Sequence, residues 1–248
     1  MKILGSDYDG TLTQGGIGEE KLTAIRNWRK RGNKFGVISG RRDDFRKELA
    51  RLYPRLEWDF FASFNGGYIT DGKGNLIDEV RFSRVDPRKL AGDLLSWGCR
   101  RVYIFGEEYL CVSAEAEPQG GEGVKVCTLT EMPEVAWFHQ VSAYLPDREG
   151  EAVAEQICRN YPGMLKPLLS EGTVDIVPAE VDKARALYRV MEFFGGRYED
   201  VIAVGDNSND MDMIREFHSY AMKNGVAQLQ AAADGVIGDI TELLEREG

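Results

Sequence analysis

The chain has 248 residues and a net charge of −10, and 43% of its residues are hydrophobic. This size and composition predict a soluble globular protein with one large domain, or a domain that carries a substantial insertion. The negative charge argues against nucleic acid and membranes as partners, because both attract proteins with a basic surface. An anionic substrate would therefore need positive charges within its own site.

Sequence signals for disulfides and membrane segments are lacking. The four cysteines, Cys99, Cys111, Cys127 and Cys158, are scattered without a CxxC pair, which is typical of free thiols in a reducing compartment. No apolar run approaches the ~20 residues of a membrane helix, and Asp7 comes too early for a signal peptide. We therefore expect a cytoplasmic protein.

The first third of the chain alternates strands and helices. Ile3 and Leu4 predict a short strand that leads into Asp7 and Asp9. Residues two apart in a strand face the same side, so the two carboxylates could converge beyond the strand. The alternative is a plain turn, because Asp-Gly is also a common turn dipeptide. The alternation that follows is typical of a parallel sheet covered by helices. The predicted elements are helix 19–31, strand 35–38, helix 43–53 and strand 58–63.

The middle of the chain has a different pattern, in which hairpins and helices mix in the α+β manner. Turn residues at 71–75 separate two short strands, and Pro87 suits the first turn of a helix. We predict an inserted domain over residues 83–178, which is a typical size for a small domain. The predicted elements are strands 68–70 and 76–80, helix 86–97, strands 101–105 and 109–112, a loose stretch 117–123, strand 137–144, helix 148–160, and strands 164–168 and 173–177.

The first pattern then returns. Residues 1–82 and 179–248 are therefore expected to form one Rossmann-like α/β core, a parallel sheet with helices on both faces. The predicted elements are helix 183–194, strand 201–204, helix 211–216, strand 219–222, helix 226–232, strand 235–237 and helix 240–246.

Chemically reactive side chains follow three of the predicted core strands. Ligands of an open parallel sheet bind beyond the carboxyl ends of its strands, so we expect these side chains to line one crevice. Four carboxylates there indicate a hard cation, and Mg²⁺ is the usual choice beside phosphate. The side chains are Asp7 and Asp9 after the first strand, Ser39 with Gly40 after the second, and Asp206, Asn209 and Asp210 after strand 201–204.

A phosphate group suits the remaining polar groups of this crevice. Ser39 and the Gly40 amide offer hydrogen-bond donors to phosphate oxygens, and Lys183 offers a positive charge. Beside a metal and a phosphate, one carboxylate can act as a nucleophile and form an aspartyl-phosphate. A second carboxylate can protonate the leaving oxygen and then activate water.

Four ordered segments resemble the motifs of the haloacid dehalogenase superfamily. They are Asp7-Tyr8-Asp9-Gly10-Thr11, Ser39-Gly40-Arg41, Asp182-Lys183 and Gly205-Asp206-Asn207-Ser208-Asn209-Asp210. The insertion between the second and third motifs, the pair Asn65-Gly66 and the segment 175–178 are similar to the Cof-type branch with a C2 cap. Two departures, Ala184 in place of the Gly of many relatives and a variant stretch at 220–225, leave the catalytic side chains untouched.

The resemblance implies a role for each carboxylate. Asp7 would be the nucleophile, and Asp9 the general acid/base that also gives its backbone carbonyl to Mg²⁺. Asp206 would be the third protein ligand of the metal, and Asp210 would hold metal-bound water or orient the site. The resemblance also implies phosphoryl binding by Ser39 with Gly40, Asn209 and Lys183.

The leading interpretation is a Mg²⁺-dependent phosphatase that acts on a small phosphorylated metabolite. Capped relatives of this branch commonly take sugar phosphates, and phosphoglycolate is the alternative substrate. A phosphomutase and a non-enzymatic phospho-receiver switch are alternative functions, although Asp9 and the long insertion argue against a receiver. Arg41 and Arg42 are either anion-capturing or structural. The sequence identifies neither the substrate nor the oligomeric state.

Overall fold

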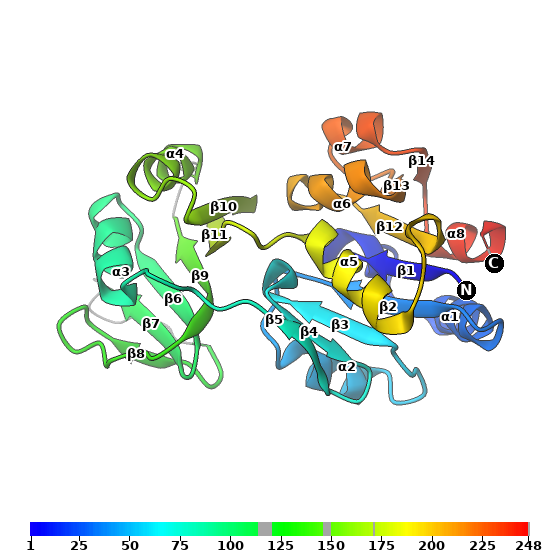
Figure 1. The fold of residues 1–248 in the computed structure, drawn as a ribbon, viewed down its shortest axis with the longest axis horizontal. Helices are drawn as coiled ribbons and strands as arrows, with labels where there is room; N and C mark the ends of the chain where they lie inside the picture. The colour runs from blue at the N-terminus through cyan, green and yellow to red at the C-terminus, as the bar shows by residue number, and fades with distance from the viewer. Residues whose placement is uncertain (114–120, 146–149, 171, 248) are drawn as a thin grey trace. The chain divides into compact units, whose positions relative to one another are not determined.

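The computed structural model describes residues 1–113, 121–145, 150–170 and 172–247. The chain forms two compact units (Figure 1). Unit 1 comprises Met1–Glu79 and Asp182–Gly248, and unit 2 comprises Val80–Val181. The predicted fold class, a Rossmann-like parallel core with an inserted α+β unit, is confirmed. The functional division into a catalytic core, residues 1–82 and 179–248, and a cap, residues 83–178, stays a prediction.

Unit 1 is built on an eight-stranded sheet. Its strands are β1 (Ile3–Ser6), β2 (Lys34–Ile38), β3 (Phe60–Ser63), β4 (Tyr68–Asp71), β5 (Leu76–Glu79), β12 (Val201–Gly205), β13 (His218–Met222) and β14 (Gly235–Ile237). The strand order is β14-β13-β12-β1-β2-β3-β4-β5. Neighbours from β14 to β3 pair in parallel, whereas β4 and β5 extend the sheet as antiparallel strands. Strand β1 therefore lies in the middle of the parallel part, between β12 and β2.

Helices cover both faces of this sheet, as Figure 1 shows. They are α1 (Glu19–Lys30), α2 (Phe45–Leu52), α5 (Lys183–Phe194), α6 (Met211–Glu216), α7 (Ala227–Ala232) and α8 (Ile240–Arg246). Leu4 of β1 belongs to the core with α1, α2 and α8, while its neighbour Ile3 belongs to the core with α5, α6 and α7. Successive residues of a strand point to opposite faces, so β1 contributes to both hydrophobic layers.

Unit 2 is a six-stranded sheet with helices packed on one face. Its elements are α3 (Pro87–Ser96), β6 (Arg101–Gly106), β7 (Tyr109–Ser113), β8 (Lys125–Cys127), β9 (Phe138–Tyr144), α4 (Gly150–Asn160), β10 (Leu165–Ser170) and β11 (Thr173–Pro178). The strand order is β10-β11-β9-β6-β7-β8, and the pairs are antiparallel except β7 with β8. Apolar residues of α3 and α4 share one core with the sheet.

The sequence missed β8, because this three-residue strand is largely exposed and begins with a charged lysine, so no apolar run marks it. Parts of two predictions, residues 117–120 of the loose stretch and 148–149 of the helix 148–160, lie outside the described residues. None of the helices in the described part of the chain has the length and apolar character needed to cross a membrane.

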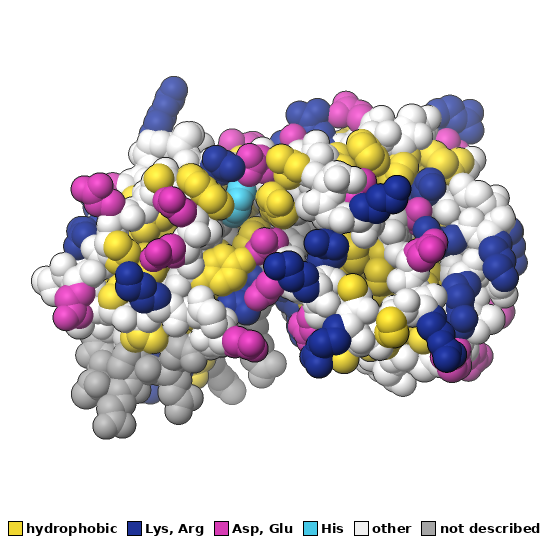
Figure 2. All heavy atoms as spheres, turned by 90° about the horizontal axis from the view of Figure 1, so that it is seen from below, with side chains coloured by type: hydrophobic (Ala, Val, Ile, Leu, Met, Phe, Trp, Pro, Cys, Tyr) yellow, Lys and Arg dark blue, Asp and Glu magenta, His cyan; other side chains and the backbone are white. Residues whose placement is uncertain are grey.

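Charged side chains of both signs are interspersed on the face drawn in Figure 2. Lys and Arg (dark blue) lie among Asp and Glu (magenta) and among apolar side chains. A nucleic-acid backbone would require a continuous track of basic residues. This face does not present such a track.

The carboxylate of Glu247 connects the end of the chain to its beginning. It accepts hydrogen bonds from Lys2 Nζ at 2.8 Å and from the Tyr220 hydroxyl at 2.6 Å. Burial alone would raise the pKa of Glu247, but these two donors outweigh it and lower the pKa from 4.5 to about 2. The folded state therefore favours the ionised form of this carboxyl more than the unfolded state does.

The substitution Glu247→Gln is expected to lower the free energy of unfolding at pH 7 by about 1.5–3 kcal/mol, the range for hydrogen bonds to a charged group. The Glu247 carboxyl has a pKa of about 2 in the folded chain and 4.5 in the unfolded chain, so between these values the unfolded chain binds more protons. The stability that Glu247 contributes is therefore complete above pH 4.5 and is lost as the pH falls toward 2. Urea unfolding at pH 7 and pH 3.5 measures this, with the exposed neighbour Glu245→Gln as control. If Glu247→Gln lowered the free energy of unfolding by the same amount at both pH values, the prediction would be contradicted.

Candidate active site

Asp7 comes directly after the central strand β1. Its amide donates to the Val204 carbonyl of β12 at 2.9 Å, which extends the pairing of the two strands by one residue. The residue is 7% exposed. The chain then leaves the strand direction in a tight turn, η1 (Tyr8–Leu12), where Gly10 has a φ of +81°. Asp7 therefore lies at the carboxyl end of the sheet, where ligands of parallel sheets bind.

Asp9 does not share the orientation of Asp7. The strand alternation expected for the two carboxylates was wrong, because β1 ends at Ser6 and Asp9 lies in the turn that follows. The Asp9 side chain is 56% exposed and forms an ion pair with Arg41. The predicted convergence of four carboxylate side chains therefore reduces, among the described residues, to three.

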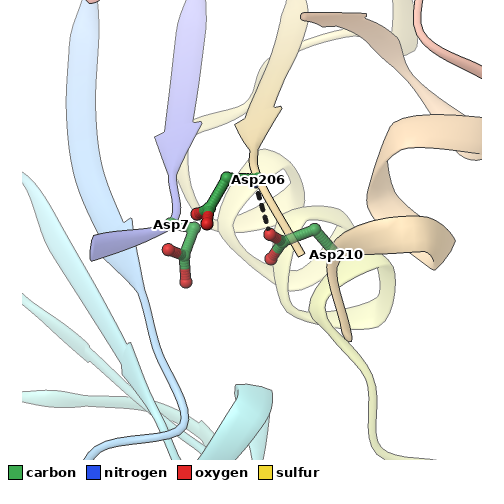
Figure 3. Close-up of side chains that lie close together, drawn as sticks. All are labelled: Asp7, Asp206 and Asp210. Carbon is green, nitrogen blue, oxygen red and sulfur yellow. Dashed lines mark hydrogen bonds between the residues drawn. The ribbon is translucent and has the colours of Figure 1, made fainter. Parts of the chain in front are cut away.

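These three carboxylates are those of Asp7, Asp206 and Asp210 (Figure 3), whose oxygens lie within 4.8 Å of one another. Asp206 follows β12 and accepts a hydrogen bond from the Thr11 hydroxyl at 2.6 Å. Asp210 ends a short turn, η4 (Ser208–Asp210), and its Oδ2 accepts the amides of Asp206 and Asn207 at 2.9 and 3.0 Å. The first strand and a segment near the C-terminus thus build one acidic cluster.

Lys183 joins two members of this cluster. It is the first residue of α5, which begins after Asp182 because the Asp182 side chain accepts the Arg185 amide at 2.7 Å. The fully buried Nζ lies 2.6 Å from Asp7 Oδ1 and 2.6 Å from Asp210 Oδ1. Lys183, which follows Asp182 in the third motif, therefore contacts Asp7 of the first motif and Asp210 of the fourth.

The electrostatics of the cluster favour an additional cation. Burial raises the pKa of Asp7 well above its usual range, Lys183 opposes this, and Asp210 and Asp206 add to it. Burial also raises the pKa of Asp206. Burial lowers the pKa of Lys183, but Asp210 and Asp7 outweigh it, so this pKa is raised and the ammonium stays charged. One ammonium beside three carboxylates leaves negative charge uncompensated, and a set of carboxylate oxygens fits a hard divalent cation.

Two of the predicted phosphate-binding residues, Ser39 and Asn209, contact a buried asparagine, Asn65. Ser39 follows β2, and its carbonyl accepts the Asn65 amide at 2.9 Å. The Asn65 side chain accepts a hydrogen bond of 3.4 Å from Asn209 Nδ2. The Ser39 Oγ accepts the Arg41 amide at 3.2 Å, which leaves the hydroxyl proton to donate elsewhere. Gly40 lies between Ser39 and Arg41 in the connection from β2 to α2.

Asn65 had no predicted role in the site. It follows β3 in a short turn, η2 (Phe64–Gly66), where Phe64, Asn65 and Gly66 have φ values of 53°, 56° and 100°. Left-handed backbone is uncommon outside glycine and concentrates at functional sites. The Asn-Gly pair was a signal for the turn, but its link to Ser39 and Asn209 depends on the tertiary fold.

Two further polar side chains that the sequence left without a role hold the first motif. Thr11 donates to Asp206, and Asn224 Nδ2 donates to the Gly10 carbonyl at 2.8 Å. Thr11 belongs to the first motif of the family resemblance, and Asn224 belongs to the stretch 220–225 that departs from it. No spacing rule identifies them, because their partners come from distant segments.

The comparisons with known proteins agree with the fold. A family model for haloacid dehalogenase-like hydrolases matches residues 4–242. Over 269 residues the chain is 30% identical to the 5-amino-6-(5-phospho-D-ribitylamino)uracil phosphatase YbjI of Escherichia coli, covering 100% of this chain and 97% of that protein. It is 22% identical over 265 residues to the 5-amino-6-(5-phospho-D-ribitylamino)uracil phosphatase YwtE of Bacillus subtilis, covering 93% of this chain and 90% of that protein. A solved sugar phosphatase of subclass IIB gives a TM-score of 0.83 at 19% identity, covering 100% and 99%.

Proposed function

The chain belongs to the haloacid dehalogenase-like hydrolases, as its four motifs predicted, and from this premise we propose that it is a phosphatase with Asp7 as nucleophile. The observation that carries the proposal is the cluster of Asp7, Asp206 and Asp210, in which Asp7 and Asp210 contact the buried Lys183 ammonium. A phosphate monoester is among the slowest groups to hydrolyse without catalysis. A fixed nucleophile beside concentrated charge is the arrangement that this reaction requires.

A divalent metal ion, with Mg²⁺ as the expected one, fits the donor set. The Asp7 and Asp206 carboxylates and the Asp9 backbone carbonyl would hold the ion. Asp210 would hold metal-bound water or orient these ligands. When bound, the ion would polarise the phosphoryl oxygens and offset the charge of the carboxylates. Ser39, Gly40, Asn209 and Lys183 would bind the phosphoryl oxygens as hydrogen-bond donors.

The reaction proceeds in two steps. First, an Asp7 oxygen forms a bond to phosphorus while the bond from phosphorus to the leaving oxygen breaks, and Asp9 gives its proton to that oxygen. An alcohol leaves, and the phosphoryl group stays on Asp7. Second, the Asp9 carboxylate takes a proton from water, whose oxygen bonds to phosphorus as the Asp7–phosphorus bond breaks. Inorganic phosphate leaves, and both aspartates return to their starting forms.

We propose a phosphate ester of a sugar or a sugar alcohol as the substrate. Two relatives that cover nearly the whole chain are named for a substrate whose phosphate sits on a ribityl chain. Phosphate on a primary hydroxyl of a polyol is the chemistry common to that substrate and to sugar phosphates. Unit 2, as the proposed cap, would select among such leaving groups.

A phosphate-release screen with Mg²⁺ tests this proposal. The panel contains several sugar phosphates, the phosphoribitylamino-uracil substrate of the relatives, phosphoglycolate and a nucleotide. The highest kcat/KM on a sugar or polyol phosphate supports the proposal, and preference for phosphoglycolate would overturn the substrate class. An isomerised sugar phosphate in place of free phosphate would indicate a phosphomutase. A long-lived phosphoaspartate without turnover would indicate a receiver switch.

The substitution Gly10→Ala is expected to lower phosphatase activity by about 10²-fold, the cost of a misplacement on the order of 1 Å. A Cβ at Gly10 would lie 2.8 Å from Asp206 Cγ and would displace a carboxylate of the cluster. The matched control is Gly15→Ala, which has a similar φ of +70° but no atom nearer than 4.0 Å. Both variants should lose about 1–2 kcal/mol of stability from left-handed backbone. Equal activity in the two variants would contradict the prediction, as measured by steady-state phosphate release.

A further inference from the structure

We propose that Arg41 is a positioning residue for Asp9, which it holds in place as the proton donor to the leaving group. The inference rests on the proposed function, because it gives Asp9 the acid/base role. It concerns an arginine that the sequence left as either anion-capturing or structural.

The contact between the two side chains is bidentate. Arg41 Nε donates to Asp9 Oδ2 at 2.8 Å, and Nη2 donates to Asp9 Oδ1 at 2.8 Å. Two parallel hydrogen bonds fix the plane of a carboxylate as well as its distance, which a single ion pair does not. The Asp9 side chain is 56% exposed, so it would otherwise move among its rotamers.

Arg41 is itself immobilised from several sides. Its guanidinium lies 5.0 Å from the centre of the Tyr8 ring and 5.1 Å from that of Phe45. The two rings pack edge to face at 4.5 Å. The Arg41 amide donates to Ser39 Oγ, and its carbonyl accepts the Phe64 amide at 2.9 Å. These contacts restrain Arg41, which belongs to the second motif and links it to Asp9 in the first.

The contact with Arg41 leaves lone pairs of the Asp9 carboxylate accessible. Each carboxylate oxygen has a second acceptor position beyond the one that Arg41 uses. A general acid acts only when it lies within hydrogen-bond reach of the leaving oxygen, and its contribution is about 10²–10⁴-fold. Loss of the support would spread Asp9 over several orientations and reduce that contribution.

Glu48 is a second carboxylate near the same guanidinium, with its Oε2 3.6 Å from Arg41 Nη1. That distance is longer than a direct hydrogen bond. The guanidinium directs its two short bonds to Asp9, so Asp9 is the group that Arg41 positions.

The test compares two phosphate esters that differ in their need for a proton. The 4-nitrophenolate ion leaves without protonation, whereas an alkoxide from a sugar phosphate requires a proton from Asp9. Release of the leaving group in a single turnover, at saturating ester, reports the first step alone, in which Asp9 acts as the acid. Arg41→Met, which keeps an apolar chain against Tyr8 and Phe45, should lower this single-turnover rate on the sugar phosphate by about 10–100-fold. It should change the single-turnover rate on 4-nitrophenyl phosphate much less and should leave KM for both esters nearly unchanged. Arg41→Lys keeps the charge without the fork and should restore part of the loss.

A double-mutant cycle adds an independent readout. In an Asp9→Asn background, Arg41→Met should cause no further loss on the sugar phosphate, because the group that it positions is gone. Arg26→Met is the matched control, since Arg26 forms an ion pair with Glu19 and its side chain is 34% exposed, against 41% for Arg41. This control should behave as the wild type on both esters.

Three outcomes would overturn the inference. Equal losses of the single-turnover rate on the two esters would indicate a general structural role, and a raised KM with an unchanged single-turnover rate would indicate anion capture. Additive losses in the double-mutant cycle would show that Arg41 acts independently of Asp9. If the wild type releases phosphate from neither ester, the proposed function itself fails. This result is distinct from the three outcomes above, in which the wild type is active.

Discussion

Asp7→Asn is expected to lower phosphate release by about 10⁴-fold or more, as loss of a nucleophile does in other covalent enzymes. An amide has the shape of the carboxylate, so its oxygen can still accept the hydrogen bond from Lys183 Nζ, which is 2.6 Å long in the wild type. The amide cannot attack phosphorus and is a poorer metal ligand. The loss should therefore appear in kcat while the protein remains folded.

Two measurements check this expectation. Steady-state phosphate release gives the rate, and acid quenching with ³²P-labelled substrate traps a hydroxylamine-sensitive phosphoprotein in the wild type only. Asp200→Asn is the control, because Asp200 precedes β12, at the end opposite Asp206, and pairs with Arg197. Normal turnover in Asp7→Asn would exclude Asp7 as the nucleophile.

Lys183→Met is expected to lower the free energy of unfolding by about 3–5 kcal/mol, the cost of removing one partner from a buried ion pair. Its ammonium is fully buried, with Asp7 and Asp210 both at 2.6 Å. Methionine fills most of the volume of the lysine side chain. The loss of unfolding free energy therefore measures the negative charge that the ammonium no longer compensates. If the cluster binds Mg²⁺, the ion binds the folded state alone and should recover part of the loss.

Urea unfolding with and without MgCl₂ measures both effects. Lys34→Met is the matched control, since the Lys34 side chain is 30% exposed and lies 3.4 Å from Asp59, and such a pair contributes about 0–1 kcal/mol. Adding Asp210→Asn to Lys183→Met should restore stability, because it removes a buried charge that has lost its partner. A Lys183→Met variant as stable as the wild type would contradict the electrostatic account of the cluster.

The family and the fold class could be predicted because local signals and motif order agree. Helix α5 shows this well, since Asp182 caps its first turn, and it ends at Gly195, which has a φ of 66°. Its predicted bounds, 183–194, match the structure. Capping and left-handed C-terminal residues are encoded within a few positions of the helix end, so they are readable from one sequence.

The first motif could be found but its geometry could not. Alternation suggested that Asp7 and Asp9 face one way, whereas β1 stops at Ser6 and Gly10 turns the chain against Asp206. That contact joins residues nearly 200 positions apart in the sequence. The same limit applies to Asp9 with Arg41, because neither propensity nor spacing specifies a side-chain partner on another element. The roles assigned to the site residues remain predictions.

The place of β1 between β2 and β12 has a consequence for the order in which the protein forms during synthesis. Unit 2 is one continuous segment, Val80–Val181, so its whole chain has been made before β12 exists. Strand β1 is made first but gains its second neighbour only when Val201–Gly205 emerges. Domains fold as units while the chain grows. We therefore expect unit 2 to fold while the edge of β1 that later pairs with β12 is still unpaired. The bond from the Asp7 amide to Val204 can therefore form only after the whole inserted unit has been synthesised.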